Sequence, residues 1–198
     1  MLVYDPKLFL DRLGSGDGLE PLSEEDKTLL DREVFRSTEW VQLDRGTLTD
    51  EQALESMKRR IPERLHASAK QLIEHWDEPR LPIEENCRLA ERLAAAGYGV
   101  YLFTNASLRH KRYWPKQAIS ALFGDRIMLS SDYKILKPAA EFFEIGLEKF
   151  GLRAEECVFI DDFPLNVEAA ERLGISGIVY HGDPALLEQR LKELGVVL

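Results

Sequence analysis

The sequence has few cysteines, no long apolar run and no excess of positive charge. Its two cysteines, Cys87 and Cys157, lie in apolar stretches and form no CxxC pair. We therefore expect buried free thiols in a reducing compartment. No run of about 18 apolar residues is present, so no membrane span is expected. The pattern of an export signal, charged residues followed by apolar ones, is also missing, and the expected location is the cytoplasm.

The net charge of −9 argues against a general nucleic-acid binder, because such a protein needs a basic surface. A small anionic ligand stays compatible, since a local pocket can be positive on an acidic protein. With 198 residues, 44% of them hydrophobic, the chain can build one domain core plus a small insert. The histidines His66, His75 and His181 have no metal-ligand spacing, so we assign them no role.

Residues 5 to about 80 are patterned as helices joined by short loops, and none of their segments has the pattern of a strand. Ser23 precedes a helix and has Asp26 three residues on as a capping partner. Thr49 stands in the same relation to Gln52. We expect a small helical bundle whose core holds the tryptophans of this half, Trp40 and Trp76.

From about Leu81 the pattern changes to strands that alternate with helices. The short apolar runs that we expect to be strands are 100–105, 126–131, 157–162 and 177–181. The intervening helices are about 10–15 residues long, and this alternation indicates a parallel sheet covered on both faces. The predicted fold class is therefore α/β, with a Rossmann-like parallel sheet as the core and a small helical part before it.

Polar residues follow three of the predicted strands, where a sheet of this class binds its ligands. Thr104 and Asn105 end the first strand and offer a hydroxyl, an amide and backbone N–H groups. Lys137 stands before a proline that precedes a helix. Asp161 and Asp162 end the strand 157–162, and such oxygen ligands suit Mg²⁺, which is typically bound by a carboxylate and phosphate oxygens.

Each of these features also has a purely structural reading. A Thr-Asn pair forms a turn or cap, a Lys-Pro pair is a solvated lysine before a helix, and an Asp-Asp pair caps a helix. Taken singly, the structural readings are the commoner ones. Three such sets at three strand ends of one sheet favour a common site.

These segments resemble the haloacid dehalogenase-like (HAD) hydrolases. "LFTN", "LKP" with "AEFFEIGLEKFGL", and "VFIDDFPLNVEAAERLGI" are similar to that family's second, third and fourth motifs, and the resemblance covers about residues 81–181. It implies a helical cap at 1–80, with a remnant of the core-to-cap linker at 1–4, and a Rossmann-like core at 81–198. "SLRHKRYWP" and, more loosely, "DRGTLTDEQA" resemble the branch of bacterial sugar-phosphate phosphatases and the phosphatase domain of soluble epoxide hydrolases.

The resemblance implies a phosphohydrolase that takes a phosphoryl group from a small phosphorylated metabolite onto an aspartate and releases it with water. Thr104 and Asn105 would bind the phosphoryl oxygens, and Lys137 would neutralise the nucleophile and the phosphate. Asp161 would ligate Mg²⁺ directly, and Asp162 directly or through water. The position of Asn166 often holds a polar residue that shapes this loop.

Other features have weaker links to the site. Arg109 belongs to a basic cluster at 109–112, which either helps to bind a sugar phosphate or forms a solvated helix face. Trp114 could stack on a sugar, although core packing is the expected role.

The family's first motif, an apolar strand that ends in the nucleophilic aspartate, has no counterpart in the sequence. The match begins just after that nucleophile, with "LVYDPKLF". Asp5 is a poor substitute, because four residues before it are fewer than a typical strand of about 5–6. We expect Asp5 to cap a helix that starts at Pro6.

That missing strand would be the interior one, between the strands 100–105 and 157–162, so the first core strand is expected to be truncated. The simplest account is a reading frame or fragment that starts at an internal methionine. The in-frame codons upstream of Met1 should then encode four or five apolar residues followed by aspartate, and stop codons or a polar run there would contradict it. As it stands, the chain is expected to be inactive or nearly so.

Two other functions stay open. A non-catalytic relative would keep the fold and bind a ligand or partner. A 2-haloacid dehalogenase is less compatible, because in the resemblance dehalogenases replace the metal-binding acids, which Asp161 and Asp162 retain. The substrate and the oligomeric state cannot be read from the residues.

Overall fold

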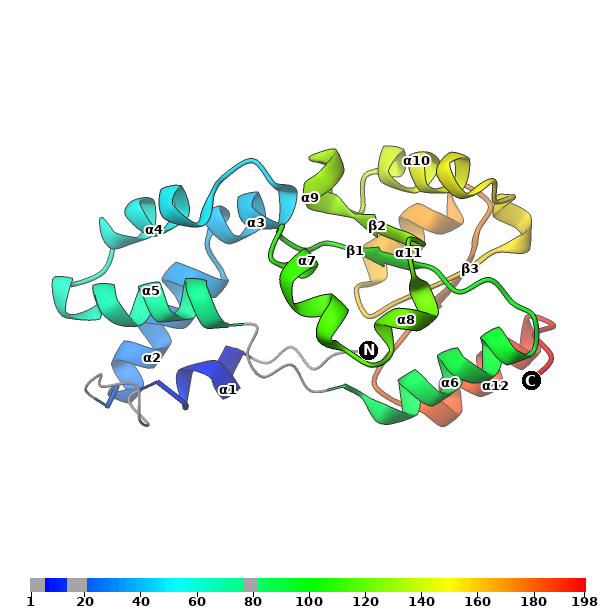
Figure 1. The fold of residues 1–198 in the computed structure, drawn as a ribbon, viewed down its shortest axis with the longest axis horizontal. Helices are drawn as coiled ribbons and strands as arrows, with labels where there is room; N and C mark the ends of the chain where they lie inside the picture. The colour runs from blue at the N-terminus through cyan, green and yellow to red at the C-terminus, as the bar shows by residue number, and fades with distance from the viewer. Residues whose placement is uncertain (1–5, 14–20, 77–81) are drawn as a thin grey trace.

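A computed structural model describes residues 6–13, 21–76 and 82–198 of the chain. Asp5 and the linker expected at 1–4 lie outside these residues. The described chain forms a helical bundle (residues 6–76) beside an α/β part (residues 82–198), as Figure 1 shows. Among the described residues, no helix combines the length and the apolarity needed to cross a membrane.

The helical bundle follows the capping signals of the sequence. Ser23 accepts a hydrogen bond from the backbone N–H of Asp26, and Thr49 forms a complete capping box with Gln52. The helices are α1 (Pro6–Leu10), α2 (Glu24–Leu30), α3 (Thr38–Arg45), α4 (Asp50–Lys58) and α5 (His66–His75), with a π-helical turn η1 (Asp31–Phe35) and a 3₁₀ turn η2 (Glu63–Leu65).

The core of the bundle is aromatic. Trp40 and Trp76 are both buried and pack edge to face with ring centroids 5.0 Å apart, so their predicted core role is confirmed. Phe35 contacts Trp40 in the same way at 4.9 Å. Edge-to-face contacts of this kind add to the free energy that the rings gain from burial.

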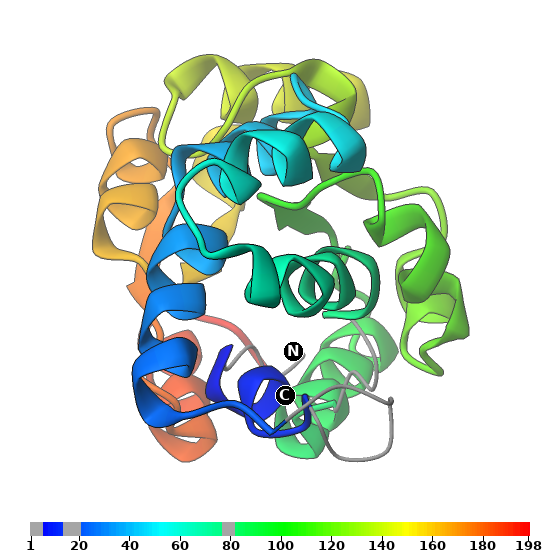
Figure 2. The same ribbon diagram turned by 90° about the vertical axis from the view of Figure 1, so that its left-hand side faces the viewer.

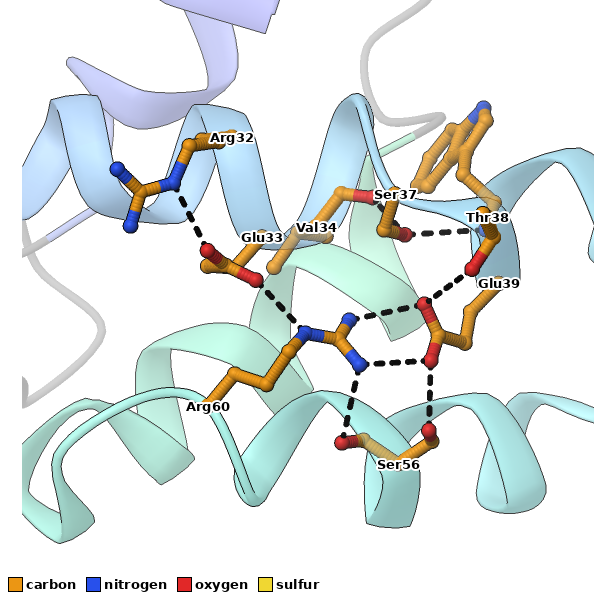
Figure 3. Close-up of polar contacts among 9 residues, drawn as sticks. Arg32, Glu33, Val34, Ser37, Thr38, Glu39, Ser56 and Arg60 are labelled. Atoms are coloured by element: carbon orange, nitrogen blue, oxygen red, sulfur yellow. Dashed lines mark hydrogen bonds and ion pairs between the residues drawn. The ribbon is translucent and has the colours of Figure 1, made fainter.

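A partly buried ion-pair network ties α3 to the segment that follows α4 (Figure 3). The Arg60 guanidinium donates to both oxygens of Glu39, at 2.8 Å each, and its Nε donates to Glu33 at 2.7 Å. The Ser56 hydroxyl adds a further hydrogen bond to Glu39. The Glu39 side chain is only 8% exposed. Arg60 holds the pKa of Glu39 down to about 2, against the opposing effect of burial.

The α/β part confirms the predicted fold class and strand order. The strand expected at 126–131 ends at Leu129, because Ser130 already begins a short helix. The elements are α6 (Glu84–Ala95), β1 (Leu102–Thr104), α7 (His110–Tyr113), η3 (Trp114–Lys116), α8 (Ser120–Phe123), β2 (Ile127–Leu129), α9 (Ser130–Tyr133), α10 (Ala140–Phe150), η4 (Ala154–Glu156), β3 (Val158–Asp161), α11 (Pro164–Glu171), β4 (Ser176–Val179) and α12 (Pro184–Glu193).

The four strands form two parallel pairs, β1 with β2 and β3 with β4. Helix α10 lies on one side of the strands, and α6 and α12 lie together on the other (Figure 1). Within the described residues, no ladder joins β1 to β3. The Leu102 N–H donates to the carbonyl oxygen of Arg126, just before β2, so the backbone groups of Phe103 face the opposite side. The backbone groups of Asp161 likewise point toward β4. Those of the neighbouring Ile160, which is 36% exposed, therefore point away from β4, toward β1.

Phenylalanines of α10 hold the two strand pairs together from one face. Phe143 packs on Phe103 of β1 and on Phe159 of β3, with ring centroids 6.4 Å and 5.0 Å away. Phe142 and Phe143 are fully buried. The relative position of β1 and β3 is therefore fixed by side-chain packing as well as by the polar contacts described below.

A groove of about 400 Å³ runs along the outer side of β4, between α11 and α12. The backbone groups of Gly177 and Val179 face it, because those of the alternate residues bond to β3. Acidic side chains line its walls, namely Glu168, Glu171 and Asp183, together with Arg190. In the part of the chain that the structure describes, β4 is thus an edge strand with charged neighbours.

The Glu39 network makes a pH-dependent contribution to stability. The pKa of Glu39 is below its usual 4.5 in the folded chain, so its contribution is present above about pH 5 and is lost as the pH falls toward about 2. We expect Glu39→Gln to lower the free energy of unfolding by about 2 kcal/mol at pH 7. The difference from the wild type should shrink markedly at pH 3. Urea titrations at the two pH values measure both effects.

The matched control is Glu168→Gln, which breaks an ion pair with Arg172 whose side chains are 51% and 73% exposed. Exposed pairs contribute little, and the change should stay within about 0.5 kcal/mol at both pH values. An equal loss for Glu39→Gln at pH 7 and pH 3 would contradict the ionic origin of the contribution.

Candidate active site

Lys137 occupies the space between the two strand pairs. Its ammonium donates to Oδ2 of Asp161 at 2.6 Å and to the carbonyl oxygen of Phe103 at 2.9 Å. The two charged side chains are 8% and 9% exposed. The ammonium also lies 5.3 Å from the centre of the Phe159 ring. One side chain thus binds the end of β3 to the free edge of β1.

Asn105 fixes the backbone of this lysine. Its amide donates to the Lys137 carbonyl at 3.0 Å, and its Oδ1 accepts the Lys137 N–H at 2.9 Å. This reciprocal pair ties the turn after β1 to the loop between α9 and α10. The side-chain amide of Asn105 is therefore engaged with Lys137, and its backbone N–H remains as the group for the predicted phosphate contact.

Asp161 and Asp162 have different surroundings. Oδ1 of Asp161 accepts hydrogen bonds from the Phe163 N–H and from Nδ2 of Asn166, both at 2.9 Å. An ionised carboxylate has about four acceptor positions, so three contacts leave one open, on Oδ2. Asp162 is exposed and makes no ion pair or hydrogen bond with the described residues.

Thr104 ends β1 opposite Leu129 and is half-buried. Within the described part of the chain, its hydroxyl makes no hydrogen bond. The structure thus brings Asn105, Lys137 and Asp161 into direct contact and places Thr104 next to Asn105 in the same turn. These contacts show the convergence that is expected where the carboxyl ends of parallel strands meet.

The turn after β1 also meets the helical bundle. The Ala106 N–H donates to Oγ of Ser130 at 2.9 Å, and the same hydroxyl contacts the carbonyl oxygen of Asp44, at the end of α3. Helix α3 lies beside α9 in Figures 1 and 2. The contact therefore runs from the bundle through a core serine to the turn that holds Thr104 and Asn105.

Arg109 lies in the same region, and its side chain is only 9% exposed. Its guanidinium pairs with Asp50 of α4 at 2.7 Å and donates to the carbonyl oxygen of Glu74 at the end of α5. In this arrangement Arg109 binds the bundle, so its role in substrate binding stays a prediction.

The other residues of the basic cluster differ in their exposure to solvent. His110 is buried and stacks on Trp114, while Lys111 and Arg112 are exposed. Trp114 is 5% exposed within an apolar cluster, which confirms its predicted packing role.

Three groups that make contacts in this region were not predicted, or only partly predicted, from the sequence. The Phe103 carbonyl is a backbone group and has no sequence signal. Ser130 lies in the run "LSS", which matches an ordinary strand end. Asn166 did give a signal, a polar residue near the start of α11 beside Asp161, but its hydrogen bond to that carboxylate could not be read from its position.

Comparison with known proteins identifies the family. A model of the haloacid dehalogenase-like hydrolases, described as hydrolases, matches residues 29–174, more than half of the chain. The chain belongs to this family. The resemblance drawn from the strand-end motifs is thereby confirmed.

Two curated relatives are phosphatases or hydrolases of phosphorylated compounds by name. The chain is 29% identical over 108 residues to a flavin mononucleotide hydrolase of Arabidopsis thaliana, a chloroplast protein. It is 37% identical over 54 residues to a glyceraldehyde 3-phosphate phosphatase of Methanocaldococcus jannaschii. These matches cover 54% and 27% of the chain. They span 43% and 24% of the relatives, less than half of either one.

Solved structures share the fold. A HAD-family enzyme of Bacteroides thetaiotaomicron superposes with a TM-score of 0.63 and 19% identity, over 92% of this chain and 90% of that one. A HAD-like hydrolase of Porphyromonas gingivalis gives 0.61 and 18%, over 93% and 88%. The Bacteroides enzyme has also been solved as a magnesium complex, at a TM-score of 0.59 and 22% identity over 79% of this chain and 84% of that one.

Removal of one charge from the Lys137–Asp161 ion pair should destabilise the fold strongly, because the other charge stays buried without a partner. Lys137→Met leaves a buried carboxylate without its cation, and we expect the free energy of unfolding to fall by about 3 kcal/mol. The double variant Lys137→Met/Asp161→Leu removes both charges and should recover most of that loss. Urea unfolding of the wild type, of Lys137→Met, of Asp161→Leu and of the double variant measures the coupling.

Lys111→Met is the control, because its partner Asp132 and the lysine itself are 39% and 58% exposed. Its effect should stay below about 1 kcal/mol. If the double variant were as unstable as the sum of its single changes, the ion pair would not be the source of the loss.

Proposed function

We propose that the protein is a Mg²⁺-dependent phosphohydrolase of small phosphorylated metabolites, sugar phosphates among them, which acts through an aspartyl-phosphate. The observation that carries the proposal is the contact of Lys137 with Asp161 and with the free edge of β1. It places a fixed positive charge beside a carboxylate and next to the Thr104–Asn105 turn. Phosphoryl transfer requires chiefly such positioning and neutralisation of charge.

Each residue of the site has a role in this proposal. The Thr104 hydroxyl and the backbone N–H of Asn105 bind the phosphoryl oxygens, and Lys137 neutralises the negative charge that gathers there. The bundle at 1–80 acts as a cap over the core at 81–198, so that substrate selection falls to its residues.

The acidic residues fit a magnesium ion. Asp161 has one acceptor position open and Asp162 has both oxygens free of described partners, and Mg²⁺ is commonly held by one or two carboxylates plus substrate phosphate and water. When bound, the ion would neutralise phosphate charge. Asn166 and the Phe163 N–H hold the Asp161 carboxylate in place for it. The Bacteroides relative, crystallised with magnesium and inorganic phosphate, supports this assignment.

The nucleophile belongs to a further strand. Within the described residues, the facing edges of β1 and β3 are bridged by Lys137 and by phenylalanine packing, and no ladder joins them. We place there a parallel strand, from outside the described residues, that ends in an aspartate next to Lys137. Its backbone would pair with the N–H of Phe103 and with the N–H and C=O groups of Ile160.

Hydrolysis of an aryl phosphate tests the proposal. We expect the chain, extended upstream by the preceding codons of its gene, to release phosphate in the presence of Mg²⁺ and hardly at all with a chelator. The 198-residue chain should be at least about a hundredfold slower, because a missing nucleophile abolishes most of the catalysis. Asp162→Asn in the extended chain should raise the Mg²⁺ concentration needed for half-maximal rate.

The alternatives give different results in the same assay. An extended chain that folds but releases no phosphate with Mg²⁺ would refute the phosphatase and favour a non-catalytic binding protein. Release of halide from a 2-haloacid, independent of Mg²⁺, would instead indicate a dehalogenase.

A further inference from the structure

Ser130 is fully buried and joins two segments that are distant in the sequence. Its Oγ accepts the Ala106 N–H at 2.9 Å and lies within hydrogen-bond distance of the Asp44 carbonyl, 86 residues earlier in the chain. A hydroxyl has one proton to donate and can accept at the same time. Ser130 therefore donates to the bundle and accepts from the turn after β1.

The bundle docks on the core around this serine. Gly46, in the left-handed region at φ 76°, lies so close to α9 that an added Cβ would be 2.8 Å from Cα of Ser131 and nearer still to its carbonyl oxygen. Lys134 donates its ammonium to the Gly46 carbonyl at 2.7 Å. The end of α3 is thus seated on α9 with no room for a side chain at Gly46.

We propose that Ser130 is a positioning residue that couples the docking of the helical bundle to the geometry of the Thr104–Asn105–Ala106 turn. When α3 is seated, the Asp44 carbonyl fixes the direction of the hydroxyl proton. The lone pairs of Oγ then face the Ala106 N–H, which is buried and has this hydroxyl as its acceptor. The further claim that this turn binds phosphate rests on the function proposed above.

The physical basis is the cost of an unpaired buried group. Without a seated α3, the Ser130 hydroxyl is free to rotate its proton toward the Ala106 carbonyl, which lies at 3.3 Å. In the seated state both the Ala106 N–H and the Asp44 carbonyl have a partner. Movement of the bundle therefore reaches the turn through the Ser130 hydroxyl, which joins the Asp44 carbonyl to the Ala106 N–H.

Amide hydrogen exchange of Ala106, followed by NMR in the 198-residue chain, tests the coupling. Ser130→Ala removes the acceptor, and Gly46→Ala unseats α3 from the bundle side without touching the turn. We expect both variants to raise the exchange rate of the Ala106 amide at least tenfold.

Two matched variants serve as controls. Ser131→Ala removes a neighbouring buried hydroxyl that has no hydrogen-bond partner among the described residues. Gly151→Ala introduces the same left-handed strain at a helix end, φ 62°, with nothing within 4 Å of the new Cβ. Both should leave the Ala106 rate within twofold of the wild type. An unchanged Ala106 rate in Gly46→Ala would overturn the proposal, because the turn would then be independent of the bundle.

The phosphate part is measured separately, in the chain extended upstream, by titration of the same variants with inorganic phosphate in the presence of Mg²⁺. We expect Ser130→Ala and Gly46→Ala to bind phosphate at least fivefold more weakly while their affinity for Mg²⁺ alone stays within twofold. An equal loss of both affinities would indicate a general structural defect and would overturn the positioning role. If the wild type binds no phosphate, the proposed function fails, whereas the exchange data still decide the coupling.

Discussion

The buried ion pair between Lys137 and Asp161 is the constraint on which the site depends. Each partner comes from a different side of the space between β1 and β3, which no ladder bridges within the described residues. Two charges taken out of water are stable only when they meet each other with further hydrogen bonds. The Phe103 carbonyl, the Asn166 amide and the Phe163 N–H supply these bonds. The contacts that stabilise the charges also fix the geometry of the strand ends.

The helical bundle also helps to hold the strand ends in place. The turn after β1 is held on one side by Ser130, which reaches Asp44, and a little further along by Arg109, which reaches Asp50 and the end of α5. Both contacts arise within a few residues of Thr104. The helical half is therefore in direct contact with the turn that follows Thr104 and Asn105.

The sequence predicts much of this arrangement. Alternating strands and helices indicated the parallel α/β class, and the polar residues that follow three strands indicated where a site would form. The proximity of Lys137 to Asp161 followed from the rule that parallel strands end at one rim. Capping residues such as Thr49 marked the helix starts, because their interactions are local.

What the sequence did not reveal depends on contacts between distant segments. The engagement of Arg109 with the bundle, the reach of Ser130 to Asp44, and the packing of Phe143 on both strand pairs each join residues far apart in the chain. Such contacts follow from the tertiary arrangement and produce no periodic pattern in the sequence. A basic residue that follows a predicted phosphate-binding turn has the same sequence signature whether it faces a ligand or a carboxylate of another helix.

The outer side of β4 has a consequence for the behaviour of the protein in solution. An exposed strand edge is a template on which a second chain can add a strand and begin to aggregate. Here the edge is only four residues long and lies in a groove whose walls carry Glu168, Glu171 and Asp183. On a chain with a net charge of −9, these carboxylates repel the like-charged edge of another copy. The acidity of the sequence thereby helps to keep the sheet from growing beyond one molecule.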